Sequence, residues 1–463
     1  MDRNRVVDLL RATALVAMVL GHWVMAGLYV DRPDGPAGAA VLRRDSLLAL
    51  EPWTHPFTWV LQVMPVFFLV GGYVNALSWR RSRARGATYG WWLRGRVSRL
   101  ARPLVPLLVA WSVLPLVAPY AGVGTDWVGI AARAALVPTW FLAIYLLVVA
   151  AVPMTLAAWE RWGWGSVATG VVAMALLDLA TLNGAVPGGE ALASQRDTIT
   201  VVGALLVWCT VHQVGYAWVD RRLGRVPHRL ALGLGSGLVL AVLVAVGPYG
   251  VSMVGVAGHG LDNTVPPRVT LVLLGLAQAG LLLAAEGPLR RLVARDGVWL
   301  LVVALNRRVM TTYLWHMTAL GLAVAAVLAT GLPVLDDEPA SAAWWWTRPV
   351  WFVALGATTL LLVALVGRFE EPAEPAHRTG AVRPLLGALG VAAGLGLVLD
   401  HGLLGAEGQV RWWLPLLPVL AVALSGTGSA RGPGPRVTRP GSKVPAPPAR
   451  PPGQWGMRGH VRR

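Results

Sequence analysis

The sequence predicts an all-α fold, a polytopic bundle of transmembrane helices with about ten core helices and two more toward the C-terminus. Two observations support this class. Of the 463 residues, 56% are hydrophobic and only 14% are charged, and the mean hydropathy is +0.58, values that argue strongly against a soluble enzyme of this size. The apolar residues also form long runs without a formal charge, as spanning helices require.

Nine of these runs have at least 19 residues, and each predicts one spanning helix. They cover residues 12–30, 53–79, 103–125, 134–159, 198–219, 230–261, 309–335, 349–367 and 412–430. Three weaker runs, 163–183, 269–285 and 384–399, bring the total to about twelve helices. The shorter apolar stretch from Gly297 to Asn306 predicts a helix that lies in the inner interface.

The basic residues predict the orientation of these spans. If the N-terminus is cytoplasmic, 32 of the 40 basic residues fall on the cytoplasmic side, which is the side that arginine and lysine favour. The net charge of +17 then reflects topology and does not indicate a nucleic-acid partner. No small-residue cleavage site follows the first apolar run, so we expect that helix to be retained. We predict a multi-pass protein of the plasma membrane with both termini in the cytoplasm.

The composition divides the chain into three parts. Residues 1–375 hold the main membrane domain, and residues 376–426 hold additional hydrophobic helices. Residues 427–463 are rich in Pro, Gly and Arg and predict a disordered, basic cytoplasmic tail. Cys209 is the single cysteine, which excludes disulfides and cysteine-rich zinc sites within one chain. No pair of His or acidic residues stands at a ligand spacing on one helix, so we expect no metal site.

The first helix carries three polar residues, Asp8, Arg11 and His22, in an otherwise apolar run. Arg11 and His22 are eleven residues apart, which places them on the same helix face at depths that differ by about 16 Å. Asp8 stands three residues before Arg11 and can pair with it. These residues could be interfacial charges and a packing histidine. We favour a functional pair, because aligned polar residues inside a membrane are costly.

Further elements with polar or unusual residues lie along the chain. In order, they are Phe67-Phe68-Leu69-Val70-Gly71-Gly72-Tyr73, Arg96-Val97-Ser98-Arg99-Leu100-Ala101-Arg102-Pro103, Thr312-Tyr313-Leu314-Trp315-His316 and Phe369-Glu370-Glu371-Pro372. Together with Arg11 and His22, they resemble the signatures of the membrane-bound acyltransferase 3 family over about residues 5–372. The first part of the chain, 1–375, is thus similar to the membrane domain of these acyltransferases.

Two positions depart from the pattern of that family. Gly71 stands where the family usually has Ser. Tyr145, in the segment that begins at Pro138, stands where many members have Glu after a Trp-Ser-Leu element. The role of that Glu does not carry over to this chain, which we expect to belong to a divergent branch.

The resemblance implies transfer of an acyl group, commonly acetyl, from acyl-coenzyme A in the cytoplasm to a hydroxyl. The acceptor would be a carbohydrate, a lipid-linked sugar or a natural product, and acyl-coenzyme A would serve as co-substrate. A hydroxyl needs a base as it attacks a carbonyl, and a neutral imidazole suits that task. We therefore expect His22 to be the general base. Arg11, paired with Asp8, would hold a donor phosphate or the developing charge.

Eight arginines between Arg80 and Arg102 form the densest basic segment, on the side where coenzyme A would arrive. Guanidinium groups suit phosphate. The arginines nearest the third helix are the predicted donor-binding residues, although the segment could also serve topology alone. They are Arg94, Arg96, Arg99 and Arg102.

Four more residues are expected near the donor. Gly71 and Gly72 lack side chains, so the backbone can approach the donor or a neighbouring helix, and packing explains them equally well. Tyr313 and His316 could orient the donor, and His316 could act as a second proton carrier. The alternative for His316 is a buried polar contact between helices.

The remaining polar features suggest partners within the membrane and an outer acceptor site. Asp178 needs a polar partner inside its span, and His212 is the nearest candidate in the sequence. The outer segment His259–Asn263 and the run Trp344–Trp346 could line an acceptor site. We favour an interfacial anchor for the tryptophans.

Two other functions fit the same sequence. A twelve-helix transporter or exporter of a small molecule or glycan would use the intramembrane Arg, Asp and His to move protons or bind substrate. It would not consume acyl-coenzyme A. A degenerate acyltransferase that serves as a scaffold is the other alternative.

Overall fold

The computed structural model describes residues 4–31, 41–121, 124–183, 191–256, 261–370, 380–405 and 409–427. The chain divides into a compact unit, residues 1–428, and a second unit, residues 429–463. The predicted tail, 427–463, lies outside the described residues except for Thr427. Every helix and strand of the described residues therefore belongs to the first unit.

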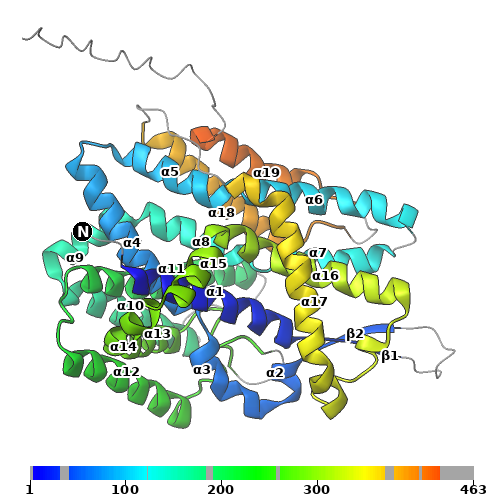
Figure 1. The fold of residues 1–463 in the computed structure, drawn as a ribbon. Coiled ribbons are helices and arrows are strands. Elements are labelled where there is room, and N and C mark those ends of the chain that lie inside the picture. Colours follow the sequence, from blue (N-terminus) through cyan, green and yellow to red (C-terminus); the bar gives the residue numbers. More distant parts are fainter. Residues whose placement is uncertain are drawn as a thin grey trace, which may run out of the picture. The chain divides into compact units, whose positions relative to one another are not determined.

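Almost all of the elements are helices (Figure 1). The first half comprises α1 (Arg5–Met25), β1 (Ala26–Asp31), β2 (Val41–Ser46), α2 (Leu47–Leu50), η1 (Pro52–Phe57), α3 (Thr58–Leu61), α4 (Met64–Ala84), α5 (Tyr89–Ala101), α6 (Leu104–Val117), η2 (Ala118–Ala121), α7 (Thr125–Leu136), α8 (Thr139–Ala150), α9 (Val152–Trp162), α10 (Trp164–Leu182) and α11 (Ala191–Val219). The second half comprises α12 (Val226–Val246), α13 (Val269–Ala284), α14 (Glu286–Val293), α15 (Asp296–Arg307), α16 (Val309–Thr330), η3 (Pro333–Leu335), α17 (Ala342–Val366), η4 (Gly367–Glu370), α18 (Val382–His401), α19 (Trp413–Val422) and η5 (Ala423–Thr427).

The predicted fold class is confirmed. Among the described residues, ten helices are long and apolar enough to cross a membrane. The bent pair α13 and α14, with an angle of 61° between its halves, could supply one more. The apolar helix Trp413–Gly426 is shorter. Each predicted span has a counterpart in this series, and the stretch from Gly297 to Asn306 is helical within α15.

Several predicted boundaries differ from those in the structure. The sequence predicts a first span that reaches Val30, but α1 ends at Met25 and the apolar residues after it form β1, which pairs antiparallel with β2. A Cβ on Gly27 would overlap the carbonyl oxygen of Asp45, so glycine permits the close approach of the two strands. Most of the arginine-rich segment from Arg80 to Arg102 is helical and belongs to the end of α4 and to α5.

Prolines divide several spans into shorter helices. Pro103 separates α5 from α6, and Pro138 separates α7 from α8. Proline cannot donate the hydrogen bond that would continue a helix, and it restricts the residue before it. Backbone carbonyls at such breaks become available to side chains from other helices.

The site lies where α1 meets the late helix α16. α1 packs against α4, α14, α15 and α16, and α4 packs along α11. Figure 1 shows α1, in dark blue, beside α15 and α16 although about 300 residues separate them in the chain. Gly72 of α4 and Gly215 of α11 face each other at the α4–α11 crossing, where a Cβ on either would overlap the opposite backbone. Gly72 therefore serves close helix packing.

Candidate active site

His22 and His316 meet at the centre of the site. His22 Nδ1 lies 2.8 Å from His316 Nε2, and the two rings are nearly parallel, with an angle of 12° between their planes. Trp23 Nε1 donates to the backbone carbonyl of His316 over 3.2 Å. Three contacts thus join the C-terminal end of α1 to the second turn of α16. The sequence predicted both histidines as site residues but not this contact.

The partners of His316 assign the protons in the neutral pair. His316 Nδ1 lies 2.7 Å from the backbone oxygen of Tyr313, which can only accept, so Nδ1 carries the proton. Nε2 of His316 then has the lone pair and accepts from Nδ1–H of His22. His22 consequently has its lone pair on Nε2. This is the arrangement of a general base whose orientation is set by a second residue.

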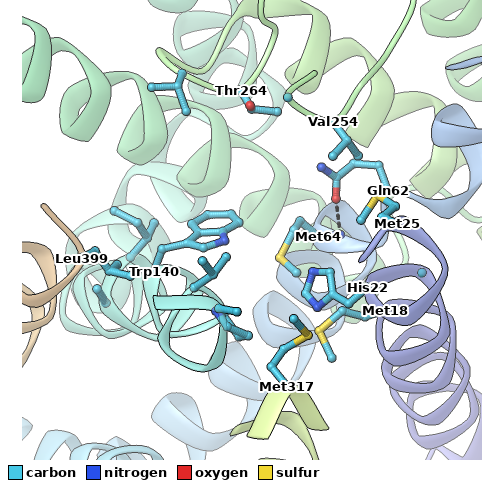
Figure 2. A pocket seen from close by; sticks show the side chains of 18 of the residues that line it. Met18, His22, Met25, Gln62, Met64, Trp140, Val254, Thr264, Met317 and Leu399 are labelled. Atoms are coloured by element: carbon cyan, nitrogen blue, oxygen red, sulfur yellow. Dashed lines mark hydrogen bonds between the residues drawn. The ribbon is translucent and has the colours of Figure 1, made fainter. Parts of the chain in front are cut away.

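His22 lines a cavity of about 960 Å³. Figure 2 shows its imidazole beside Met18, Met64 and Met317, with Trp140 and Leu399 across the cavity. Most of the described lining side chains are aliphatic, aromatic or methionine, and Arg44 is the one charged residue among them. His22 thus faces a large, mainly apolar space, a composition that is typical of ligand pockets.

Arg11 lies about three turns from His22, toward the N-terminal end of α1. Its Nη2 donates to Asp8 Oδ1 over 3.0 Å, and its Nε donates to Asn306 Oδ1 of α15. The Nδ2 of Asn306 donates in turn to the backbone oxygen of Asp8 over 2.8 Å. The predicted pairing of Arg11 with Asp8 is observed, and Asn306 orients both residues. An exposed fraction of 23% leaves part of the Arg11 side chain accessible.

The start of α16 is capped by a residue from far along the chain. Glu370 accepts from the backbone N–H of Met310 over 3.2 Å and of Thr311 over 3.0 Å. Thr311 Oγ1 also donates to the same carboxylate over 2.7 Å. A carboxylate at a helix N-terminus satisfies free N–H groups and complements the helix dipole. Glu370 thereby anchors the helix that carries Tyr313 and His316.

Tyr313 has a structural contact at the proline break. Its hydroxyl donates to the backbone oxygen of Pro138, at the break between α7 and α8. Its ring contacts Phe141 edge-on at a centroid distance of 5.5 Å. Phe141 also packs on Phe67 and Phe68 of α4. Tyr313 lines the cavity as well, so it links the cavity wall to this aromatic cluster.

The four predicted donor arginines have different surroundings. Arg94 is buried, and its Nη2 donates to the backbone oxygen of Gly426 at the end of the helical unit. Arg96 lies over the Trp92 ring at 5.7 Å. Arg99 is exposed and Arg102 is half-buried. Arg11, Arg96 and Arg99 lie within electrostatic range of the Tyr145 side chain.

A second cavity offers another basic region. It has a volume of about 730 Å³ and lies at the start of α1, between α4, α11 and α14. Within the described part of the chain, its charged lining residues are Arg5, Arg221, Arg229, Arg290 and Glu286. Glu286 pairs with Arg229 over 3.0 Å and with Arg290 over 2.8 Å. These four cations and one anion give this cavity a net positive charge.

Asp178 does not meet His212, the nearest candidate in the sequence. Its carboxylate lies 3.2 Å from Arg268 Nη1 and accepts from the backbone N–H of Val269 over 2.7 Å and from the Tyr249 hydroxyl over 3.3 Å. Burial, followed by the charge of Asp178, raises the pKa of Tyr249 to about 12. The Asp178–Arg268 ion pair links α10 to the segment before α13, and neither residue lines either cavity.

The residues suggested for an acceptor site are dispersed. His259 lies outside the described residues, and Asn263 donates to the backbone oxygens of Gly250 and Ser252, which organises its own loop. Trp344 is buried, whereas 84% of Trp346 is exposed. None of these lines the large cavity among the described residues. In the same described part of the chain, no group of three or more His, Cys, Asp or Glu side chains is placed to hold a metal ion.

The sequence model of the acyltransferase 3 family, an acyltransferase domain, matches residues 4–368. The chain belongs to the acyltransferase 3 family. It is a multi-pass membrane acyltransferase, and the matched region runs from α1 to the end of α17. No curated protein and no solved structure matches the chain significantly. The helices α18 and α19 lie beyond the family match.

Gly71 and Tyr145 of this acyltransferase lie directly against each other. A Cβ on Gly71 would lie 2.7 Å from Tyr145 Oη and 2.9 Å from Tyr145 Cε2. A serine at position 71 is therefore incompatible with the tyrosine as it is placed here. Gly71 therefore accommodates Tyr145.

Tyr145 also begins a chain of polar contacts that sequence reasoning missed. Asn75 Nδ2 lies 3.3 Å from Tyr145 Oη and 3.2 Å from His212 Nε2. His212 Nδ1 lies 3.0 Å from the Tyr216 hydroxyl, which lies 2.9 Å from Thr155 Oγ1. Asn75 is a polar residue within an apolar span, and that was the signal available in the sequence. This network of the acyltransferase joins α4, α8, α9 and α11.

Proposed function

We propose that this acyltransferase transfers an acyl group from acyl-coenzyme A to a hydroxyl group, with His22 as the general base. The observation that supports the proposal most directly is the His22–His316 contact. It leaves the lone pair of His22 on Nε2, and the same side chain lines the large cavity. The acceptor class is a carbohydrate, a lipid-linked sugar or a natural product, and the reaction takes place in the plasma membrane with both termini in the cytoplasm.

The proposed reaction proceeds by addition and elimination. The acceptor oxygen attacks the thioester carbonyl carbon while His22 Nε2 takes the hydroxyl proton. The tetrahedral intermediate then collapses, the C–S bond breaks, and the proton on His22 goes to the sulfur. The products are the acyl ester and free coenzyme A. His316 acts as a positioning residue, because its Nε2 accepts from His22 Nδ1 and so orients the base.

The phosphates of the donor need cationic partners at a distance from the thioester, because coenzyme A carries them at the far end of a long neutral arm. Arg11, Arg96 and Arg99 lie within electrostatic range of Tyr145, and Arg11 lies on the side of His22 toward the N-terminal end of α1. The basic cavity lined by Arg221 and Arg290 is the second place that fits a polyanion. We favour the first, because Arg11 lies on the same helix face as the base.

The test of the base uses purified protein in lipid nanodiscs, and thiol release from acetyl- or octanoyl-coenzyme A is measured. His22→Ala should lower kcat by about 10²–10⁴-fold, the usual contribution of a general base, with an unchanged unfolding temperature. His316→Leu should lower kcat while KM for the donor stays constant, and His316→Gln should restore part of the rate because its amide oxygen can accept from His22 Nδ1–H. Full activity in His22→Ala would overturn the assignment of the base.

The donor site is tested by two matched pairs of substitutions. Arg96→Gln with Arg99→Gln should raise KM for acyl-coenzyme A by about tenfold or more, since a charge-assisted hydrogen bond contributes about 1.5–3 kcal/mol. Arg221→Gln with Arg290→Gln should leave KM within about twofold. The reverse result would place the phosphates in the basic cavity instead.

The transporter alternative makes a different prediction for the purified protein reconstituted in proteoliposomes. A transporter would move a solute across proteoliposomes without releasing thiol from any acyl-coenzyme A. The family match supports the enzyme, because the matched model is that of an acyltransferase domain.

A further inference from the structure

One wall of the large cavity comes from a helix that lies beyond the family match. The match ends at residue 368, whereas α18 begins at Val382. Five residues of α18 line the cavity, and they recur at helical spacing along one face. They are Leu389, Ala392, Ala393, Gly396 and Leu399.

The rest of α18 is firmly packed. A Cβ on Gly394 would lie 2.6 Å from Pro418 Cδ, and one on Gly390 would lie 2.8 Å from Ala421 Cβ, so these glycines permit close contact with α19. The helix also packs on α5 and α8. Gly396 differs from these two residues, because a Cβ there would meet nothing within 4 Å. The side of α18 toward the cavity is thus held in place and lined partly by small residues.

The cavity fits an aliphatic chain better than a sugar. Four methionines, Met18, Met25, Met64 and Met317, lie around His22 (Figure 2), and flexible thioether side chains adapt to apolar ligands of varied shape. A sugar would bring several hydroxyl groups into this lining, and a hydroxyl buried without a partner costs free energy. An acetyl group would occupy only a small part of about 960 Å³.

The position of the cavity relative to the cations indicates which substrate supplies the chain. Arg11 lies toward one end of α1, and the cavity lies around the other end, where His22 forms part of its lining. A donor whose phosphates lie near Arg11 and whose thioester lies at His22 would direct its acyl chain into the cavity. We propose that the cavity binds the acyl chain of the donor, that this chain is longer than acetyl, and that α18 limits its length.

This inference rests on the proposed function and names the substrate class of the same site. Binding of acyl-coenzymes A with chains from two to sixteen carbons is measured on the purified protein by competition and by thermal stabilisation. Each buried methylene should tighten binding by about fourfold, because its burial contributes about 0.8 kcal/mol. Octanoyl-coenzyme A should therefore bind at least tenfold more tightly than acetyl-coenzyme A.

The matched variants are Gly396→Leu and Gly356→Leu. Both glycines lie in long apolar helices, and a Cβ at either would meet nothing within 4 Å, but only Gly396 lines the cavity. Leucine is a better helix former than glycine, so both variants should fold. Gly396→Leu should weaken octanoyl binding by about tenfold and change acetyl binding by less than about twofold, whereas Gly356→Leu should change neither.

The possible outcomes separate this inference from the proposed function. If acetyl and octanoyl donors bind equally and Gly396→Leu has no effect, the inference fails while acyl transfer stands. If thiol release from every donor is absent, the proposed function fails first. In a second arm, acetyl-coenzyme A is fixed and alcohols of increasing chain length are offered as acceptors. A Gly396→Leu effect on the alcohol series alone would assign the cavity to the acceptor and overturn the proposal.

Discussion

The contact between Gly71 and Tyr145 allows a quantitative test of the packing between α4 and α8. In Gly71→Ala, the new Cβ would lie 2.7 Å from Tyr145 Oη. The tyrosine cannot withdraw easily, because Phe141 stacks on it at a centroid distance of 5.4 Å and Asn75 bonds its hydroxyl. Overpacking of this kind costs about 1–3 kcal/mol. Alanine recovers up to about 1 kcal/mol of helix propensity, so a net loss of about 1–2 kcal/mol is expected.

The assay is a double-mutant cycle, read from reversible unfolding of the purified protein in mixed micelles. Tyr145→Ala alone should cost about 3–5 kcal/mol, as large-to-small changes at aromatic sites do. In that background, Gly71→Ala should become neutral or stabilising. The coupling free energy should thus be about 1–3 kcal/mol. Gly356→Ala, with nothing within 4 Å of its Cβ, is the control and should lose no stability. An equal effect of Gly71→Ala in both backgrounds would refute the steric explanation.

Three further predictions concern stability. Burial alone would raise the pKa of Asp220, but hydrogen bonds from Arg80 and others hold it below its ordinary value. The stabilisation is therefore present at neutral pH and lost as the pH falls through the lowered pKa. Asp220→Asn should melt below wild type near neutral pH, and the two melting curves should converge in acid. Gly72→Ala should cost about 3 kcal/mol or more in the same unfolding assay, because its Cβ would overlap backbone that cannot rotate away. Arg268→Met should lower stability by about 3–5 kcal/mol by leaving Asp178 buried without its cation, and adding Asp178→Asn should recover part of that loss.

Much of the fold could be predicted because a bilayer imposes simple limits on sequence. A spanning helix needs an apolar run of known length, so charge-free stretches located most of the spans in the described residues. The common face of Arg11 and His22 followed from helical geometry alone. The end of α1 could not be predicted, because the residues from Ala26 to Val30 are as apolar as a membrane helix and only their pairing with β2 makes them a strand.

The sequence could indicate candidate site residues but not how they are arranged in space. His22 and His316 are 294 positions apart, and no spacing rule relates two helices whose packing is unknown. The same limit applies to Asp178, whose partner Arg268 is 90 positions away. The contribution of α18 to the cavity was equally hidden, because small and apolar residues such as Gly396 are ordinary in any membrane helix.

Asn306 and His316 together fix the position of α1 along its own axis. Asn306 forms hydrogen bonds with α1 near Arg11, and His316 forms one at His22, so the neighbouring segment holds the helix at two points along its length. A slide of α1 by one residue, about 1.5 Å, would break both sets of hydrogen bonds at once. The distance between the His22 imidazole and the Arg11 guanidinium group is therefore fixed by the packing of α1. A donor molecule that contacts both groups has to span that distance.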